Sequence, residues 1–256
     1  MNKIDLVICV FAAVLLTISV AAAMEIPANE NAIENSAAPE NSPVIELAKD
    51  GWLVERVDFI HYANGVTKPA KPSKEPVCYK LMGVKWLDTP VNYVINPNYP
   101  GMNDNDITTA ISASAETWDA VTEATNLFGS YAVDNSAQFL TKTDGKNALV
   151  FGDYPNDGVI AVARVWYTRV GKTKKIVEFD IEFDTDFTWG DATVDPSKMD
   201  LQNIATHELG HAIGLSDIYT TACSEVTMYG YSSEGDTEKR SLEQPDITGL
   251  QKLYGI

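Results

Sequence analysis

Positive charge is scarce in this chain of 256 residues: 19 Lys and Arg stand against 36 Asp and Glu, giving a net charge of −17. Nucleic-acid binding relies on clustered Lys and Arg, so this balance argues against a nucleic-acid partner. Long apolar runs are also lacking after the first 23 residues, and no later segment is long and apolar enough to span a membrane. The composition, 45% hydrophobic and 21% charged, is that of a folded globular protein.

The first 23 residues have the pattern of a secretory signal peptide. Lys3 precedes an apolar run from Leu6 to Val20, and three alanines follow at 21–23. We therefore expect a secreted, extracellular or cell-surface protein with no stable membrane span in its mature form. An uncleaved anchor is the alternative, although the apolar run is shorter than the roughly 20 residues that a span requires.

Cysteine is rare, with three in the chain. Cys9 lies in the predicted signal peptide and would leave with it, so Cys78 and Cys223 remain. An even number in an exported chain predicts a disulfide between them.

Composition divides the rest of the chain into two parts. Residues 24–76 are rich in Glu, Asn, Ala and Pro, which predicts a disordered acidic and Pro-rich pro-segment or linker, although residues 51–65 alternate more like a strand. The folded domain is predicted at 77–256. Its patterns indicate strands near 90–97, 147–154, 158–168 and 174–187, and helices at 104–125, 200–213 and 245–255.

Histidine is also rare, and two of the chain's three histidines stand together in "ATHELGHAIGLSD", residues 205–217. His207 and His211 are four residues apart on a predicted helix, so both imidazoles can reach one ion. Glu208 lies between them in the H-E-x-x-H pattern, where it can accept a proton from water bound to the metal. Zinc suits two imidazoles and keeps one position for water in catalytic sites.

A catalytic zinc needs a third protein ligand. Gly214 can adopt the positive φ that turns the chain back, and Asp217 follows three residues later. We therefore favour Asp217 as the third ligand. A distal glutamate, Glu234 or Glu238, is the alternative, although both lie in a polar stretch that is typical of a loop.

The segment "HELGHAIGLSD" resembles the metzincin signature H-E-x-x-H-x-x-G-x-x-[H or D], and "VTMYGY" resembles the metzincin Met-turn, with Met228 beneath the zinc. "GVIAVA" at 158–163 resembles the edge strand of the matrixins, and the similarity continues from about residue 83 to the end of the chain. This resemblance implies an α/β (α+β) metzincin-like catalytic domain. Its parts would be a twisted, mixed five-stranded sheet with a backing helix, an active-site helix, a Met-turn and a C-terminal helix.

The family implies a zinc metalloendopeptidase acting on protein or peptide substrates, with Glu208 activating the zinc-bound water. The peptide would add as a strand along the edge residues Gly158, Val159, Ile160 and Ala161. We expect a monomer.

This chain departs from its commonest relatives in three places. Asp217 stands where most have a third histidine, as in the snapalysin-like branch, and Val162 stands where many matrixins place a histidine for a second, structural zinc. The matrixin latency motif with its unpaired cysteine is absent as a sequence. Cys78 could still be a zinc-blocking thiolate instead of a disulfide partner.

Acidic residues in "GDYPNDG" and "EFDIEFDTDF" could bind structural calcium through Asp153, Asp157, Asp180 or Asp184. His61, the remaining histidine, is expected to have a packing or surface role. Two other functions stay open: a secreted binding protein with a vestigial zinc site, and a gluzincin-type peptidase that uses the distal glutamate.

Overall fold

A computed structural model describes residues 43–48, 51–65, 77–122 and 126–255, all within the compact unit Ala37–Ile256. The predicted signal peptide and most of the predicted linker, including 66–76, lie outside these residues. In the described part of the chain, no helix combines the length and apolar character needed to cross a membrane.

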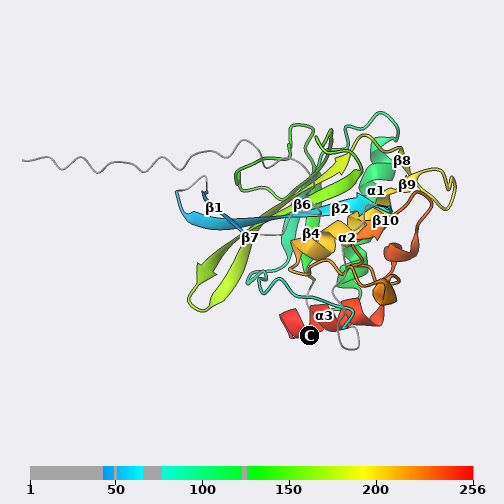
Figure 1. Cartoon of the computed structure of the whole chain (residues 1–256). Helices are drawn as coiled ribbons and strands as arrows, with labels where there is room; N and C mark the ends of the chain where they lie inside the picture. The colour runs from blue at the N-terminus through cyan, green and yellow to red at the C-terminus, as the bar shows by residue number, and fades with distance from the viewer. Residues whose placement is uncertain (1–42, 49–50, 66–76, 123–125, 256) are drawn as a thin grey trace, which may run out of the picture. The chain divides into compact units, whose positions relative to one another are not determined.

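A mixed sheet is the centre of the fold (Figure 1). Its strand order is β1-β2-β6-β7-β5-β3-β4, and β10 pairs with β2. The elements are β1 (Val44–Leu47), β2 (Leu53–Ala63), β3 (Val91–Ile95), α1 (Asp104–Asp119), β4 (Phe128–Val133), β5 (Ala148–Gly152), β6 (Val159–Val170), β7 (Thr173–Asp184), β8 (Trp189–Gly190), β9 (Met199–Asp200), α2 (Leu201–Ala212), β10 (Tyr231–Ser232) and α3 (Gln244–Tyr254), with 3-10 turns at Thr221–Cys223 and Glu238–Arg240.

The five strands β4, β3, β5, β7 and β6 form the predicted mixed sheet: β6 is antiparallel to β7, and the other neighbours are parallel. The α/β class is therefore confirmed. β6 and β7 are each twelve residues long and form a hairpin at Gly171, whose φ of 65° suits the tight turn. Most of β6 is buried, as expected of a strand with neighbours on both sides.

The first two strands lie within the segment that was expected to be disordered. β2 pairs with β6 from Glu55 to Tyr62, and β1 pairs with β2. Residues 44–47 and 53–63 are therefore ordered strands of the sheet, which corrects the expectation that this segment is disordered. Composition missed this because β2 gains its hydrogen bonds from a strand about a hundred residues further along the chain.

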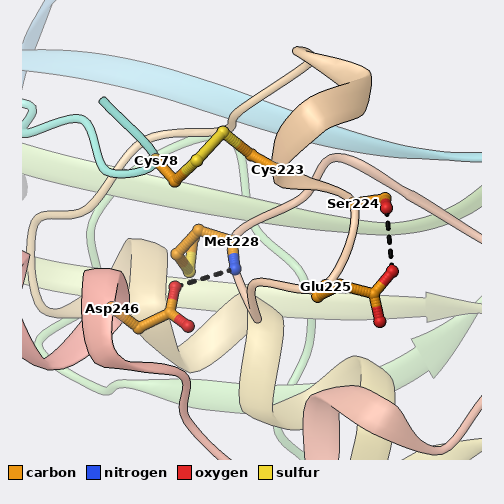
Figure 2. Close-up of a disulfide and its surroundings, with 6 residues drawn as sticks. All are labelled: Cys78, Cys223, Ser224, Glu225, Met228 and Asp246. Carbon is orange, nitrogen blue, oxygen red and sulfur yellow. Dashed lines mark hydrogen bonds between the residues drawn. A yellow bond between two sulfur atoms is a disulfide. The ribbon is translucent and has the colours of Figure 1, made fainter. Parts of the chain in front are cut away.

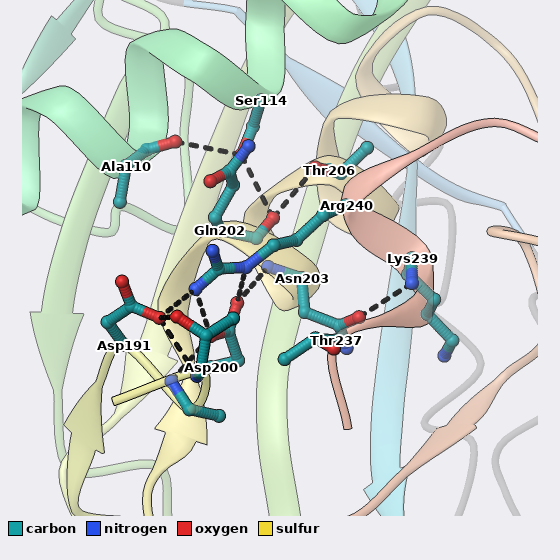
Figure 3. Close-up of polar contacts among 12 residues, drawn as sticks. Ala110, Ser114, Asp191, Asp200, Gln202, Asn203, Thr206, Thr237, Lys239 and Arg240 are labelled. Carbon is teal, nitrogen blue, oxygen red and sulfur yellow. Dashed lines mark hydrogen bonds and ion pairs between the residues drawn. The ribbon is translucent and has the colours of Figure 1, made fainter. Parts of the chain in front are cut away.

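Helix α2 is held by neighbours at its N-terminal end (Figure 3). The Asp200 carboxylate caps the helix by accepting a hydrogen bond from the Asn203 amide at 2.8 Å. The buried carboxylate also pairs with Arg240, which reaches Asp191 as well. Along the helix, Ser114 of α1 donates to the Gln202 carbonyl at 3.0 Å. These contacts fix the position of the helix that carries both candidate histidines.

The backing helix α1 packs its apolar side onto α2. Ile107, Ile111 and Trp118 are fully buried, and the Trp118 indole donates to the Thr206 carbonyl at 2.8 Å. The helix was predicted to extend to residue 125 but ends at Asp119, whose carboxylate accepts hydrogen bonds from the amides of Leu127 and Phe128. The tertiary contact with β4 therefore ends the helix earlier than its periodicity suggested.

Candidate metal centre

Three side-chain atoms converge at the C-terminal end of α2. His207 Nε2 lies 3.2 Å from His211 Nε2 and 3.2 Å from Asp217 Oδ1, and His211 Nε2 lies 3.3 Å from the same oxygen. In a tetrahedral zinc site with bonds of about 2.0 Å, neighbouring ligand atoms are about 3.3 Å apart. The three atoms therefore have the spacing of a tetrahedral ligand set, and the structure brings together the three residues proposed from the sequence.

The hydrogen bonds of the two histidines determine which ring nitrogen carries the proton. His207 Nδ1 lies 2.7 Å from the Thr227 carbonyl, and His211 Nδ1 lies 2.9 Å from the Leu215 carbonyl. A carbonyl can only accept, so both Nδ1 atoms must donate, and each ring in its neutral form presents a lone pair at Nε2. Two lone pairs and a carboxylate oxygen thus face one point. Three acceptors at this distance repel each other unless a cation lies between them. Without a metal a proton takes this place: burial opposes it, but the Asp217 carboxylate raises the pKa of His211.

The charges at this point also suit a cation. Burial lowers the pKa of His207 to about 3, so its imidazole is neutral, which is the form that binds a metal. Burial opposes ionisation of Asp217, but the two histidines outweigh it and hold the Asp217 pKa well below its usual value. Its other oxygen, Oδ2, accepts a hydrogen bond from the Tyr219 hydroxyl at 3.1 Å. Tyr219 therefore orients the carboxylate.

Gly214 explains how Asp217 returns to the helix. Its φ is 102°, and a Cβ on it would lie 2.3 Å from the Val84 carbonyl oxygen, so only glycine fits. The Leu215 amide bonds back to the Gly210 carbonyl at 3.0 Å and closes the helix end. Ser216 then donates to the Lys80 carbonyl at 2.8 Å, which holds the chain as it enters residue 217.

Met228 lies beneath the same helix, as expected for a Met-turn. A Cβ on Gly210 would lie 2.3 Å from the Met228 sulfur, so the turn and α2 are in close contact. Asp246 of α3 accepts hydrogen bonds from the amides of Thr227 and Met228, the second of which is visible in Figure 2. Because the Thr227 carbonyl in turn holds His207, Asp246 positions a candidate ligand through this turn.

Glu208 is fully buried beside the three candidate ligands. Neither of its oxygens makes a well-formed hydrogen bond; the carboxylate faces the Ala163 amide of β6 and His61 Nδ1, which is 3.4 Å from Oε1. Burial raises the pKa of Glu208 to about 8. A buried carboxylate with a raised pKa accepts a proton more readily than an exposed one, which suits a general base.

Strand β2 occupies the outer edge of β6, along which the substrate peptide was predicted to lie. His61 pairs with Ala161 and Tyr62 with Val159, and the Ala63 amide donates to the Gly158 carbonyl at 2.9 Å. All four residues predicted to line a substrate, Gly158, Val159, Ile160 and Ala161, therefore lie along β2. The apolar run at 158–163 gave no sign of this partner, because a strand pattern indicates which faces are buried but not which segment pairs with the strand.

Two side chains of β2 cover the candidate metal ligands. The Phe59 ring stacks on His211 with ring centroids 4.1 Å apart and an interplanar angle of 11°, and the His61 ring meets His207 edge-on, also at 4.1 Å. His61 is 1% exposed, so it is a buried residue beside Glu208. It forms a cluster with His207 and Glu208, and His207, His211 and Asp217 form another. The sequence did not place His61 at this site.

Lys239 lies at the far end of the pocket that contains His61. Its ammonium donates to the carbonyls of Tyr229 at 2.5 Å and Tyr231 at 2.9 Å and contacts the Ser232 hydroxyl at 2.8 Å. His61 Nε2 lies 3.1 Å from the same hydroxyl and 3.4 Å from Lys239 Nζ. Burial lowers the pKa of Lys239 to about 7.

The structure does not support the alternative ligands that the sequence left open. Cys78 is bonded to Cys223, so it is not a free thiolate beside the metal (Figure 2). Among the described residues, Glu234 and Glu238 join no cluster with His207 or His211 that could hold an ion.

A second acidic cluster lies away from these histidines. Asp153, Asp184 and Asp186 offer oxygens within 4.8 Å of one another. Asp157 is not in this cluster, and Asp180 instead accepts bonds from the amides of Leu140 and Ala148. Asp184 Oδ2 is buried without a hydrogen-bond partner, and burial raises the Asp184 pKa.

Comparison with known proteins adds to this geometry. A family model described as Matrixin matches residues 85–255. The chain belongs to the matrixin family. It is 28% identical over 181 residues to stromelysin-1 of Mus musculus, covering 67% of this chain and 33% of that protein. It is 29% identical over 185 residues to matrix metalloproteinase-16 of Homo sapiens, covering 69% and 28%.

Interstitial collagenase of Oryctolagus cuniculus is similar at 29% identity over 176 residues, covering 67% of this chain and 33% of that protein. This matrixin therefore spans about a third of the length of the curated relatives it matches. The matched residues contain the three convergent ligands, Glu208 and Met228, while β1 and β2 lie before the matched region.

Proposed function

We propose that this matrixin is a secreted, zinc-dependent endopeptidase. The observation that carries the proposal is the convergence of three potential metal-ligand atoms, His207 Nε2, His211 Nε2 and Asp217 Oδ1, at tetrahedral spacing. These residues would hold the zinc implied by the family. When bound, zinc would act as a Lewis acid that polarises the scissile carbonyl and acidifies a water.

Glu208 would move the proton. Its carboxylate is buried beside the metal site, and burial favours the protonated form, so it would take a proton readily from the attacking water. It would then deliver this proton to the nitrogen of the leaving amine, so that both products leave neutral at the broken bond. Ala163 and the apolar side of β6 would exclude other water from the carboxylate.

The substrate would lie in the place that β2 holds. β6 has β7 on one side and β2 on the other, so an extended peptide can pair with β6 only where β2 now pairs. β10 runs parallel to the end of β2 and would form the opposite wall.

An extracellular or cell-surface location fits the Cys78–Cys223 disulfide, because such bonds persist in oxidising compartments. Protein or peptide substrates follow from the peptidase family, and we expect the enzyme to act as a monomer.

The proposed function is tested by metal analysis and proteolysis. The purified chain is expected to contain one zinc per molecule and to cleave casein once the edge of β6 is free. A chelator should abolish cleavage, and added zinc should restore it. A folded chain that binds no zinc would contradict the proposal, whatever its activity.

Calcium at the acidic cluster is a second, separate proposal. Asp153, Asp184 and Asp186 would supply the oxygen ligands that calcium prefers, and the partnerless Asp184 Oδ2 supports a bound cation. Millimolar calcium is expected to raise the melting temperature, because ligand binding to the folded state stabilises it. Asp184→Asn should remove this shift, whereas Asp195→Asn, in an exposed turn, should retain it. An equal calcium response in the Asp184 variant would refute the site.

A further inference from the structure

Strand β2 has the geometry of a bound peptide. It runs antiparallel to β6 over the register pairs from Glu55–Tyr167 to Tyr62–Val159, and its end runs parallel to β10 through Tyr62–Tyr231 and Ala63–Ser232. Figure 1 shows β2 between these two strands. Main-chain hydrogen bonds on both sides are how an extended peptide adds to a sheet edge.

The side chains of β2 alternate between two environments. Phe59 and His61 point to the metal ligands and Glu208, and both are almost fully buried. Ile60 and Tyr62 point to the other face, where they pack with Val159 and Val162. Residues two apart on a strand share a face, so the backbone between Phe59 and His61 crosses directly over the candidate catalytic residues.

The pocket around His61 fits a planar side chain whose far edge carries a polar atom. The ring of His207 forms one wall, and Glu208 faces His61 Nδ1 at 3.4 Å. At the far edge, Ser232 and Lys239 contact His61 Nε2. Phe59 stacks flat on His211 two residues earlier, so this position takes an aromatic ring.

We propose that residues 53–63 are an internal pseudosubstrate. Strand β2 occupies the place of the substrate peptide and so keeps the peptidase latent. Phe59 and His61 indicate which kinds of substrate side chain the cleft selects. This inference rests on the proposed function. It names the substrate class as extended peptides that carry an aromatic ring at the Phe59 position. Two residues later they carry a planar, hydrogen-bonding side chain in the pocket that Ser232 and Lys239 close.

The chain offers a direct test of latency. The full-length protein is made with a recognition site for a specific protease inserted in 66–76, a segment that lies between β2 and Cys78. After cleavage, both Cys78 and its partner Cys223 lie on the catalytic part, so no disulfide retains the fragment that carries β2. This fragment is removed by size exclusion and its removal is checked by mass. Phe59→Ala together with His61→Ala, in the same protein, aids release if the cut fragment stays bound.

The expected result is a large rise in kcat/KM on casein after the fragment leaves. If the open form is about 0.1–10% of the uncut protein, the rise is about 10- to 1,000-fold. Equal activity before and after removal overturns the pseudosubstrate and leaves the endopeptidase intact. Unfolding of the remaining part, seen by circular dichroism, also overturns it, because β2 would then be an integral strand. A folded, zinc-loaded, fragment-free protein without activity refutes the proposed function itself.

A synthetic peptide tests the selected side chains. The peptide of residues 53–63, LVERVDFIHYA, should inhibit the fragment-free enzyme by raising KM without changing kcat. The peptides with Phe59→Ala or His61→Ala should inhibit at least about tenfold less well, since each loses a buried contact. Leu53→Ala is the matched control, because Leu53 is 66% exposed. Equal inhibition by all four peptides would show that the main chain binds without selecting these side chains.

Discussion

Replacing Glu208 by Gln is expected to lower kcat by roughly 10²- to 10⁴-fold in the enzyme from which the β2 fragment has been removed. This is the usual range for loss of a general base. An amide has nearly the same shape as the carboxylate but cannot take a proton from water. The zinc content should not change, because His207, His211 and Asp217 are untouched. Steady-state kinetics on a quenched peptide, with zinc measured by mass spectrometry, checks both expectations.

The stability of this variant carries a second expectation. The Glu208 carboxylate is fully buried without a well-formed hydrogen bond, so removing its charge should raise the melting temperature of the metal-free protein. Glu225→Gln is the matched control, since this carboxylate is exposed just before the Met-turn and bonds to Ser224 (Figure 2). Activity above a tenth of wild type in the Glu208 variant would show that another group takes the proton.

Replacing Asp217 by Ala is expected to weaken zinc binding by more than about 100-fold, since loss of even an outer partner of a ligand costs 10- to 100-fold. The two remaining histidines would supply two protein ligands, whereas catalytic zinc sites have three. Activity should fall with zinc content. Competition with a chromogenic chelator measures the affinity, and a peptide assay at saturating zinc separates binding from catalysis.

Three further variants locate the effect at Asp217. Tyr219→Phe removes the hydrogen bond to Oδ2 and should weaken zinc by about 10-fold, as a lost outer partner does. Glu234→Ala and Glu238→Ala should leave zinc unchanged, because neither residue joins the histidines. If the Asp217 variant retained one zinc and full activity, the third ligand would lie elsewhere.

Local pattern was enough to predict much of the centre. The spacing of His207 and His211 depends on the helix period alone, and Gly214 indicated the turn that brings Asp217 back. The two cysteines that remain after the predicted signal peptide are bonded in the structure. The resemblance to the metzincins then identified the family and predicted the mixed sheet, because the recognised motifs lie within the residues that the family model matches.

Contacts between distant segments were not predictable in this way. Asp246 holds the Met-turn, and Lys239 reaches His61, yet each is an ordinary charged residue in the sequence. His61 was expected to have a packing or surface role, and it is buried, but its place beside Glu208 was not foreseen. A single sequence carries no signal for such pairs, since the energy of each contact arises only after the fold has brought both partners together.

The sequence by itself determined the residue types of the candidate ligands, their helical spacing and the turn at Gly214, because these depend on bonds and periods within a few residues. Only the tertiary structure decided which segment of the chain pairs with β6. β2 shows an alternating pattern that would suit many neighbours, and register is chosen by the burial of Phe59 and His61 against α2. That choice placed a segment expected to be disordered across the candidate catalytic residues.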